Sequence, residues 1–430
     1  MTPATKKLMS LAVGAALGGM VSSAIAGGFA IGTQSGSGTG NAFAGGAAAA
    51  DDASVAWSNP AAMTLIPGKQ IAGALHVVMP SFKFTNQGST GAFAAPGTGD
   101  GGDGGDTAFI PNGFFTWAYS PNLSFGLALN APFGLKTEYD TGWRGQFQAL
   151  KSEVKSVNIN PSVGYKISNT VSIGGGLSIQ TLDAELTSAT PSPALGNQKL
   201  QADDIGYGFN IGILVQASPA TRLGAHYRSK IKYELEGKQT FDGPAASLAN
   251  SNVVADLEVP ASLSLSVFHA MGQQWELMAD ATWTGWDKLK DLTATRTTAA
   301  PAFGPAGVVG STAAQLNFNW DNTWRYGVGA NYKWSPQTKL RFGVAFDETP
   351  TNDVDRNARL PDEDRKWLAF GVQWKPSKTG ILDVGYAHEF IKDASINSGG
   401  PAPLTCPPHC LTGEFKNKAD IFSIQYSQSF

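Results

Sequence analysis

FSIQYSQSF, residues 422–430, ends the chain with apolar and polar side chains in alternation. One face carries Phe422, Ile424, Tyr426 and Phe430. The opposite face carries Ser423, Gln425, Ser427 and Ser429. A period of two predicts a β-strand, and the apolar face indicates contact with lipid. Gln428 interrupts that face near its end, and a soluble β-sandwich with an exposed aromatic end is the alternative.

Segments with the same period recur from about residue 70 onward, separated by two kinds of connection. Six connections are short and rich in turn-forming residues: 120–122, 168–170, 218–221, 271–274, 335–338 and 376–380. Seven are long: 86–107, 135–150, 188–203, 239–252, 297–312, 350–364 and 395–413. Short and long connections alternate in bacterial outer-membrane barrels, where the short turns face the periplasm. The sequence therefore predicts an all-β fold, a fourteen-stranded antiparallel transmembrane β-barrel with both ends on the periplasmic side.

Aromatic residues gather close to the short turns. They are Trp117, Tyr119, Tyr165, Trp275, Tyr332, Trp334 and Trp374. Aromatic side chains favour strands in general, which would scatter them along each strand. Bunching at one end indicates instead an aromatic girdle at one membrane interface.

The N-terminal residues divide into two segments before the barrel begins. Residues 1–26 have Lys6 and Lys7, then an apolar stretch and the small-residue site Ala24-Ile25-Ala26. This pattern predicts a signal peptide with a mature chain from Gly27, and a transmembrane helix is the alternative.

Residues 27–68, the N-terminal segment, are rich in Gly, Ala and Ser and match neither strand nor helix periodicity. A ring of fourteen strands is too wide for its own side chains to fill. We therefore expect residues 27–68 to plug the lumen of a barrel formed by residues 69–430. The segment contains Asn59-Pro60-Ala61, in which proline fixes the local backbone.

A second proline interrupts the third expected strand, in the sequence Asn130-Ala131-Pro132-Phe133-Gly134. Pro132 lacks a ladder donor and Gly134 permits a bend, so strand pairing should fail here. Two interpretations follow. Either the wall of the barrel opens at this place, or the strand ends and Pro132 begins the outer loop.

Composition argues against several classes of function. A net charge of −3 with 15% charged residues provides no basic stripe for nucleic acid. The five histidines show no arrangement with Ser or Asp that suggests a nucleophile and base, so we expect no enzyme and no cofactor. A general diffusion porin and an adhesive surface protein are the remaining alternatives.

The two cysteines, Cys406 and Cys410, stand in the turn-like sequence CPPHC. In an exported protein this spacing indicates a local disulfide, and a metal site that includes His409 is the alternative. Asp100, Asp103 and Asp106 are spaced by three in GTGDGGDGGD, residues 97–106. They lack a full set of calcium ligands, so we interpret this stretch as an extracellular loop and expect no metal.

Several motifs in order resemble the FadL family of outer-membrane transporters for long-chain fatty acids and other hydrophobic compounds. They are GFAIGTQSGSGTGNAFAGGAAAADDAS at 28–54, Asn59-Pro60-Ala61, PFGLKTEYD at 132–140, VPASLSLSV at 259–267, WTGWDKL at 283–289 and LPDEDRKWL at 360–368. The resemblance implies a fourteen-stranded barrel, an N-terminal hatch and a kinked third strand with a side opening. It places Gly27, Gly28 and Phe29 at an inner pocket and makes Asn59, Pro60 and Ala61 the anchor of the hatch.

The resemblance also implies basic residues that hold the substrate's carboxylate, yet the equivalent positions here are Ser188 and Asp321. Arg144, Arg325 or a loop lysine would have to take that role. The alternative is a different substrate, such as the aromatic hydrocarbons that some family members import. The family further implies residence in the bacterial outer membrane as a monomer, in contact with its lipid. Assembly machinery would recognise the C-terminal strand that ends in Phe430.

Overall fold

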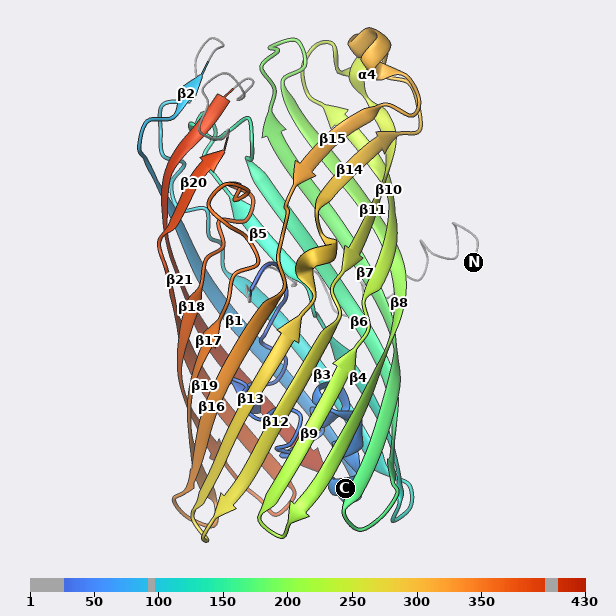
Figure 1. Cartoon of the computed structure of the whole chain (residues 1–430), viewed down its shortest axis with the longest axis vertical. Coiled ribbons are helices and arrows are strands. Elements are labelled where there is room, and N and C mark those ends of the chain that lie inside the picture. Colours follow the sequence, from blue (N-terminus) through green and yellow to red (C-terminus); the bar gives the residue numbers. More distant parts are fainter. Residues whose placement is uncertain (1–26, 92–96, 399–408) are drawn as a thin grey trace.

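The computed structural model describes residues 27–91, 97–398 and 409–430. In these residues one antiparallel sheet closes on itself to form a barrel (Figure 1). Its strands are β1 (Lys69–Asn86), β2 (Thr90–Gly91), β3 (Ala108–Ala118), β4 (Leu123–Asn130), β5 (Gly134–Glu138), β6 (Lys151–Lys166), β7 (Val171–Ala189), β8 (Asn197–Ser218), β9 (Thr221–Arg228), β10 (Ile231–Phe241), β11 (Ser251–Val259), β12 (Ser262–Met271), β13 (Trp275–Thr284), β14 (Asp291–Arg296), β15 (Thr312–Asn317), β16 (Thr323–Lys333), β17 (Thr338–Asp347), β18 (Arg365–Trp374), β19 (Gly380–Ile391), β20 (Ala394–Ser398) and β21 (His409–Ser429). The helical turns are α2 (Gly36–Thr39), α3 (Val55–Ser58), η1 (Pro60–Leu65), α4 (Ala246–Ala249), η2 (Trp286–Lys288) and η3 (Pro301–Gly307). None of these helices is long and apolar enough to span a membrane.

The first and last strands close the barrel. β1 pairs with β21 from Gln70 opposite Ser429 to Asn86 opposite Gly413, and its other edge pairs with β3. Six strands around the barrel are interrupted, so that each carries two labels: β4 and β5, β9 and β10, β11 and β12, β13 and β14, β15 and β16, and β19 and β20. The short β2 follows β1 and pairs with β21, so it adds no further strand to the ring. The described residues thus form fourteen strands around the barrel, which confirms the predicted fold. Closure satisfies the backbone groups that lipid cannot.

All six predicted short turns lie at one end of the barrel, together with the C-terminus (Figure 1). The long connections lie at the other end, but several of their expected boundaries are wrong, including that of 395–413, which overlaps β20 and β21. β7 continues to Ala189 and β8 already starts at Asn197, whereas a loop was expected over 188–203. The facing ends of these two strands, residues 187–188 and 197–203, are mostly polar because they rise above the apolar band, so their composition is like that of a loop. Residues 134–138 form β5, so the expected loop over 135–150 starts later.

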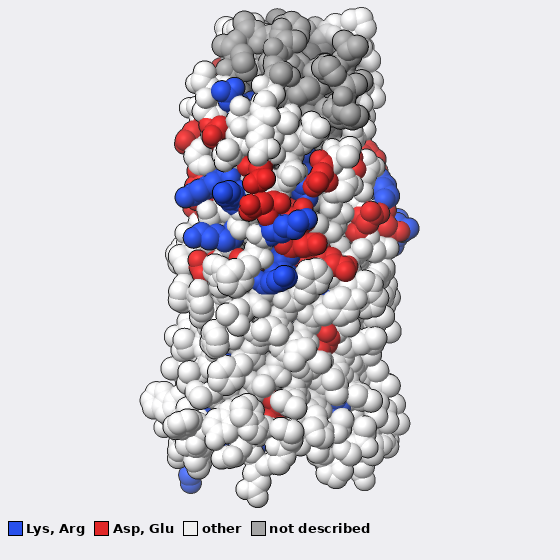
Figure 2. All heavy atoms as spheres, turned by 60° about the vertical axis from the view of Figure 1, so that its left-hand side comes forward, with Lys and Arg blue, Asp and Glu red and all other residues white. Residues whose placement is uncertain are grey.

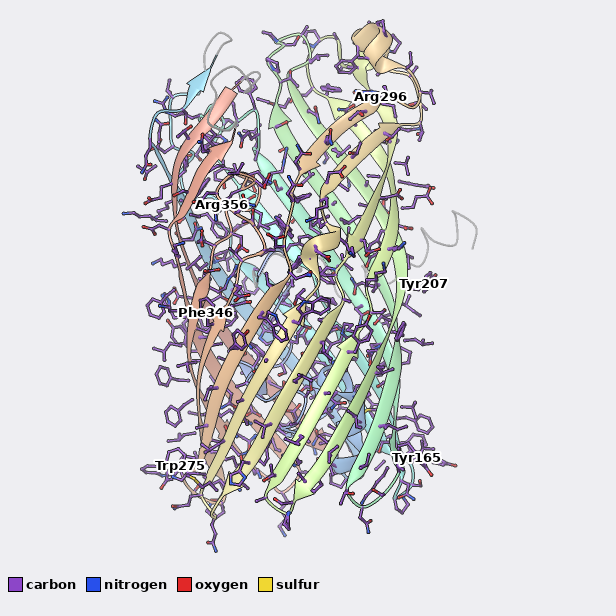
Figure 3. All side chains as sticks on the ribbon, viewed as in Figure 1. Tyr165, Tyr207, Trp275, Arg296, Phe346 and Arg356 are labelled. Atoms are coloured by element: carbon purple, nitrogen blue, oxygen red, sulfur yellow. The ribbon has the colours of Figure 1, made fainter. Side chains whose placement is uncertain are left out.

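The outer surface has the character of a membrane-spanning barrel. The girdle residues Tyr165 and Trp275 point outward beside the short turns, at 49% and 39% exposure (Figure 3). In the last strand Phe422, Ile424 and Tyr426 are exposed while the serines and Gln425 between them are buried, as predicted. Figure 2 shows charged side chains gathered in a belt toward the loop end, above a band almost free of charge. That uncharged band is what lipid requires.

The N-terminal segment, drawn in blue, runs inside the barrel (Figure 1). Polar side chains of the wall hold it: Gly36 N donates to Gln425 Oε1 at 2.9 Å, and Thr39 Oγ1 donates to Ser423 Oγ at 2.8 Å. Small residues allow this contact. A Cβ on Gly40 would lie 2.8 Å from the Cα of Gly371 in the wall, closer than real Cβ atoms approach.

Candidate functional site

The wall of the barrel is interrupted where Pro132 was predicted to disturb it. β4 pairs with β3 as far as Leu129 opposite Gly113, and the chain then leaves the sheet. It returns as β5, which pairs with β6 only. Among the described residues β3 and β5 share no ladder pairing, so the sheet is interrupted between them. The strand resumes after Pro132, and this contradicts the interpretation in which Pro132 begins the outer loop.

Residues 29–31 of the N-terminal segment lie against this interruption. Ile31 N donates to Pro132 O at 2.8 Å, and Gly134 N donates to Phe29 O at 2.9 Å. Ala30 and Phe133 are directly opposite each other as an isolated antiparallel bridge. The N-terminal segment therefore supplies backbone partners that β3 does not, and any movement of residues 29–31 would release them.

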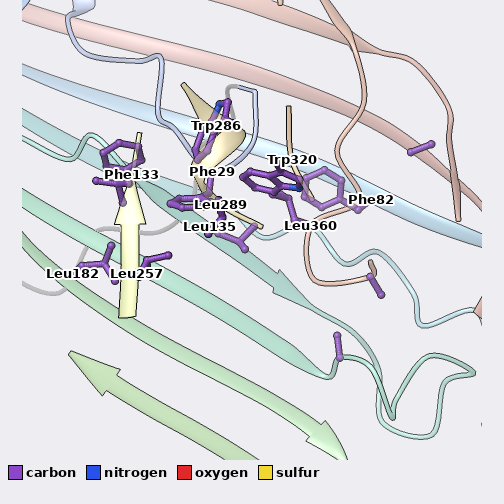
Figure 4. Packing of buried hydrophobic residues seen from close by; sticks show 14 of the residues in the cluster. Phe29, Phe82, Phe133, Leu135, Leu182, Leu257, Trp286, Leu289, Trp320 and Leu360 are labelled. Atoms are coloured by element: carbon purple, nitrogen blue, oxygen red, sulfur yellow. The ribbon is translucent and has the colours of Figure 1, made fainter. Parts of the chain in front are cut away.

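Aromatic rings surround Phe29 (Figure 4). Its ring centroid lies 5.0 Å from that of Trp286, 5.8 Å from Trp320 and 5.7 Å from Phe133. Gly28 has a φ of +67°, and a Cβ there would lie 2.9 Å from both tryptophan rings. Only glycine suits that position, because it tolerates positive φ and leaves room for the rings.

Phe29 also borders an apolar cavity of about 60 Å³. Its other lining residues are Leu135, Val154, Ala184, Leu186, Leu235, Leu257, Leu289, Leu292, Leu316, Phe318, Arg359 and Leu360. Arg359 is the only polar or charged residue of this set. Six of its leucines come from β5, β7, β10, β11, β14 and β15 and two from connections, so the cavity is assembled from segments far apart in the sequence. It can accommodate an apolar group.

A second, larger cavity, of about 300 Å³, lies between the N-terminal segment and the wall, and both polar and apolar side chains line it. Asp280 and Arg325 lie in its wall 3.5 Å apart as an ion pair, and His226 and Asp347 also line it. Phe133 lines this larger cavity whereas Leu135 lines the apolar one, so the interruption borders both.

Buried carboxylates hold the start of the N-terminal segment. Gly27 N donates to Asp347 Oδ2 at 3.2 Å, and Gly28 N donates to Asp362 Oδ2 at 2.8 Å. Burial raises the pKa of Asp362, and the nearby Arg365 opposes that shift only in part. Arg365 in turn pairs with Glu389 at 3.3 Å. Residues 27 and 28 are therefore tied to the end of β17 and to the connection between β17 and β18.

The Asn59-Pro60-Ala61 turn attaches the other end of the segment. Asn59 is fully buried, and its Nδ2 donates to Ala47 O at 2.7 Å and to Ile213 O of β8 at 3.1 Å. Its Oδ1 accepts from Ala61 N at 3.1 Å and so caps η1. One amide thus joins two parts of the N-terminal segment to the barrel wall.

The residues predicted to contact a headgroup are not brought together. Arg144 and Ser188 line neither cavity, and Arg325 lines the larger one, where it pairs with Asp280 and donates to Ala42 O. Asp321 is exposed in the connection before β16. Sequence reasoning missed Arg359, whose only signal was its place directly before the LPDEDRKWL motif.

The structure does not test the expected signal peptide, the disulfide or the alternative metal site at the two cysteines. Residues 1–26 and Cys406 lie outside the described residues, so the signal peptide, the disulfide with Cys410 and a site with His409 are still predictions. Asp103 accepts from Ser81 Oγ and Phe82 N, whereas Asp106 pairs with Lys136. No group of three potential metal ligands occurs in the part of the chain that the structure describes.

Comparison with known proteins gave three kinds of match. The sequence model described as "Outer membrane protein transport protein (OMPP1/FadL/TodX)" matches residues 19–430. The long-chain fatty acid transport protein of Escherichia coli K12 is 24% identical over 447 residues, with 94% of each chain covered. The crystal structure of a Pseudomonas aeruginosa FadL homologue superposes with a TM-score of 0.84 at 25% identity, covering 94% of this chain and 100% of that one. The toluene transporter TodX of Pseudomonas putida has a TM-score of 0.69 at 16% identity, with 92% and 98% covered, and shows a similar fold.

Proposed function

This chain belongs to the outer-membrane transport protein family OMPP1/FadL/TodX, and on that premise we propose that it passively imports long-chain fatty acids or similar hydrophobic molecules. It is a barrel of the bacterial outer membrane. The observation that carries the proposal is the apolar cavity beside Phe29, which borders the interruption of the wall. We propose transport without catalysis, because the family is described by transport alone.

Burial of an acyl chain supplies the driving force for binding. Each methylene removed from water contributes about 0.8 kcal/mol, so ten of them contribute on the order of 8 kcal/mol. A cavity of about 60 Å³ is too small for that chain. Phe29 must therefore move when the ligand binds. Because Phe29 O accepts from Gly134 N, its movement would also unpair the edge of the interrupted strand.

We propose that the bound molecule leaves sideways through the wall between Asn130 and Gly134. The larger cavity below contains charged side chains such as Asp280 and Asp347, beside which an apolar chain gains less from burial than it does among apolar groups. A sideways path keeps the chain among apolar groups and ends in lipid. Asn130 Nδ2 donates to Gln34 Oε1 at 2.6 Å, which is a second contact that would loosen with the N-terminal segment.

In this proposal residues 27–68 act as a hatch within the barrel of residues 69–430. Gly27, Gly28 and Phe29 form its mobile end at the pocket. Asn59, Pro60 and Ala61 form its fixed end, because Asn59 joins η1 to β8 by buried hydrogen bonds. A hatch fixed at one end can open at the other without leaving the barrel.

Aromatic hydrocarbons are the second candidate substrate. Phe29, Trp286 and Trp320 offer ring faces and edges within 6 Å of one another, and the small cavity suits a single ring better than a long chain. Both candidates use the same cavity and the same wall interruption.

Uptake by whole cells tests the proposal. Cells without a transporter of their own would express either this chain or an empty vector, and radiolabelled oleate and toluene would be supplied to each. We expect faster uptake of at least one compound with the chain present, and no ion conductance in planar bilayers. Uptake equal to that of the vector for both compounds would refute transport, and steady ion conductance would indicate a general diffusion porin.

A further inference from the structure

Arg359 occupies a special position next to the apolar cavity. It lies in the connection between β17 and β18 and is 8% exposed. Two residues of the strand after the interruption hold its backbone: Thr137 Oγ1 donates to Arg359 O at 2.9 Å, and Tyr139 Oη donates to Ala358 O at 2.7 Å. The arginine is therefore fixed in the cavity wall by neighbours on β5 and just after it.

The guanidinium of Arg359 has only neutral partners. Its Nη1 donates to Ser152 Oγ at 3.1 Å, to Thr187 O at 3.2 Å and to Lys151 O at 3.3 Å. Nη2 donates to nothing among the described residues, and the buried Nε has no partner there either. No carboxylate of the described residues lies within ion-pair distance. A buried charge without a counter-charge is costly, so proteins rarely leave one in this state.

Other buried arginines of the barrel are compensated in ways that Arg359 is not. Arg341, Arg356 and Arg365 each pair with carboxylates. The buried Arg296 and the half-buried Arg222 and Arg228 have no carboxylate ion pair, but each guanidinium lies over an aromatic ring, at 4.8, 4.0 and 3.3 Å from the centroids. Arg359 has neither compensation among the described residues. Burial lowers its pKa to about 10, so the side chain is still charged at neutral pH.

We propose that Arg359 binds the carboxylate of an amphiphilic substrate whose apolar chain occupies the cavity. This inference rests on the proposed function and favours a fatty acid over an aromatic hydrocarbon as the substrate, because a neutral hydrocarbon would leave the charge of Arg359 unpaired. A guanidinium and a carboxylate form charge-assisted hydrogen bonds, for which Nη2 and Nε are still available. The leucines would then receive the acyl chain. The site thus supplies an anion partner even though Ser188 and Asp321 do not.

Two ligands with the same chain separate headgroup from tail. The affinities of oleate and oleyl alcohol would be measured by equilibrium dialysis against the purified full-length protein in detergent. Wild-type protein should prefer oleate. In Arg359→Met the affinity for oleate should fall about ten- to hundredfold, the range that a hydrogen bond to a charged group supplies, so that the preference disappears. Arg359→Lys should restore part of it, since lysine keeps the charge but loses the bidentate geometry.

Arg296→Met is the matched control, because Arg296 is also a buried outer arginine without a carboxylate partner but lines neither cavity. It should keep the preference for oleate. If Arg359→Met also keeps it, the inference is wrong while the proposed function stands. If wild-type protein binds neither ligand, the proposed function itself fails.

A measurement on wild-type protein covers the case in which Arg359→Met does not fold. Oleate labelled with carbon-13 at its carboxyl would be bound and titrated by NMR. A carboxylate paired with Arg359 should stay ionised well below the pH at which it protonates in detergent alone. Titration of the bound ligand at the same pH as in detergent would overturn the inference.

Discussion

Replacement of Phe29 by alanine should make the protein bind its ligand more tightly. Phe29 is 7% exposed and packs against Trp286, Trp320 and Phe133 with centroids 5.0 to 5.8 Å away. Removing such a buried ring costs the closed state about 3–5 kcal/mol. In the wild type, a ligand that displaces Phe29 must break this packing, which lowers its affinity. In the variant the packing is already absent, so binding does not include that cost.

The expected gain in affinity follows from these energies. About 3 kcal/mol corresponds to roughly a hundredfold change in an equilibrium constant, and the ligand loses some contact with Phe29 itself. We therefore expect Phe29→Ala to bind oleate about ten- to hundredfold more tightly than wild type. Equilibrium dialysis with radiolabelled oleate and purified protein in detergent measures this directly.

Phe318→Ala is the control for the loss of an aromatic ring. Phe318 lines the same cavity and lies 5.1 Å from Trp320, but it does not belong to the N-terminal segment. Its removal takes away contact surface without freeing the hatch, so oleate should bind severalfold more weakly. If Phe29→Ala weakens binding in the same way, Phe29 is a fixed part of the wall, and the reasoning about displacement is refuted.

Three further substitutions test the hatch and the wall. Asn59→Ala removes three buried hydrogen bonds, at about 0.5–1.5 kcal/mol each, and should raise ion conductance in planar bilayers. Conductance at the wild-type level would show that Asn59 does not anchor the hatch. Gly28→Ala places a Cβ 2.9 Å from two tryptophan rings, so limited proteolysis should cut the displaced N-terminal segment faster than in wild type. An unchanged rate would contradict that steric argument. Pro132→Ala supplies the missing backbone donor and should reduce oleate uptake, whereas uptake at the wild-type rate would show that the proline is not needed for passage.

The barrel could be predicted from sequence because lipid imposes a simple rule on it. Each strand within the bilayer must alternate, as in Phe422 to Ser427, and each short turn must contain residues that allow reversal. The rule fails above the bilayer. The facing ends of β7 and β8, residues 187–188 and 197–203, are mostly polar, and for that reason the connection between them was expected to start before Ala189 and to end after Asn197.

The site was less predictable because it is assembled across the barrel. Pro132 and Gly134 predicted that strand pairing fails at this place, because proline lacks a backbone donor and glycine permits a bend. Only the pairing pattern in the structure distinguished an interruption from the end of a strand. The cavity beside Phe29 depends on leucines from many strands. Arg359 depends on how residues 350–364 fold inward, which no local pattern specifies. Arg144 was predicted from charge alone, and charge does not reveal which arginine reaches an apolar wall.

The central claim is that residues 29–31 must leave the wall interruption for a hydrophobic molecule to pass. Ala30 and Phe133 are opposed between Ile31 N→Pro132 O and Gly134 N→Phe29 O, the geometry of a non-hydrogen-bonded pair, whose Cα atoms lie about 4.5 Å apart and suit a disulfide. Cysteines at positions 30 and 133, with Cys406 and Cys410 changed to serine, would lock the segment in place. Oleate uptake by cells expressing the locked variant should fall to the level of the empty vector and return when a reductant is added. Full uptake with the disulfide formed would contradict the account.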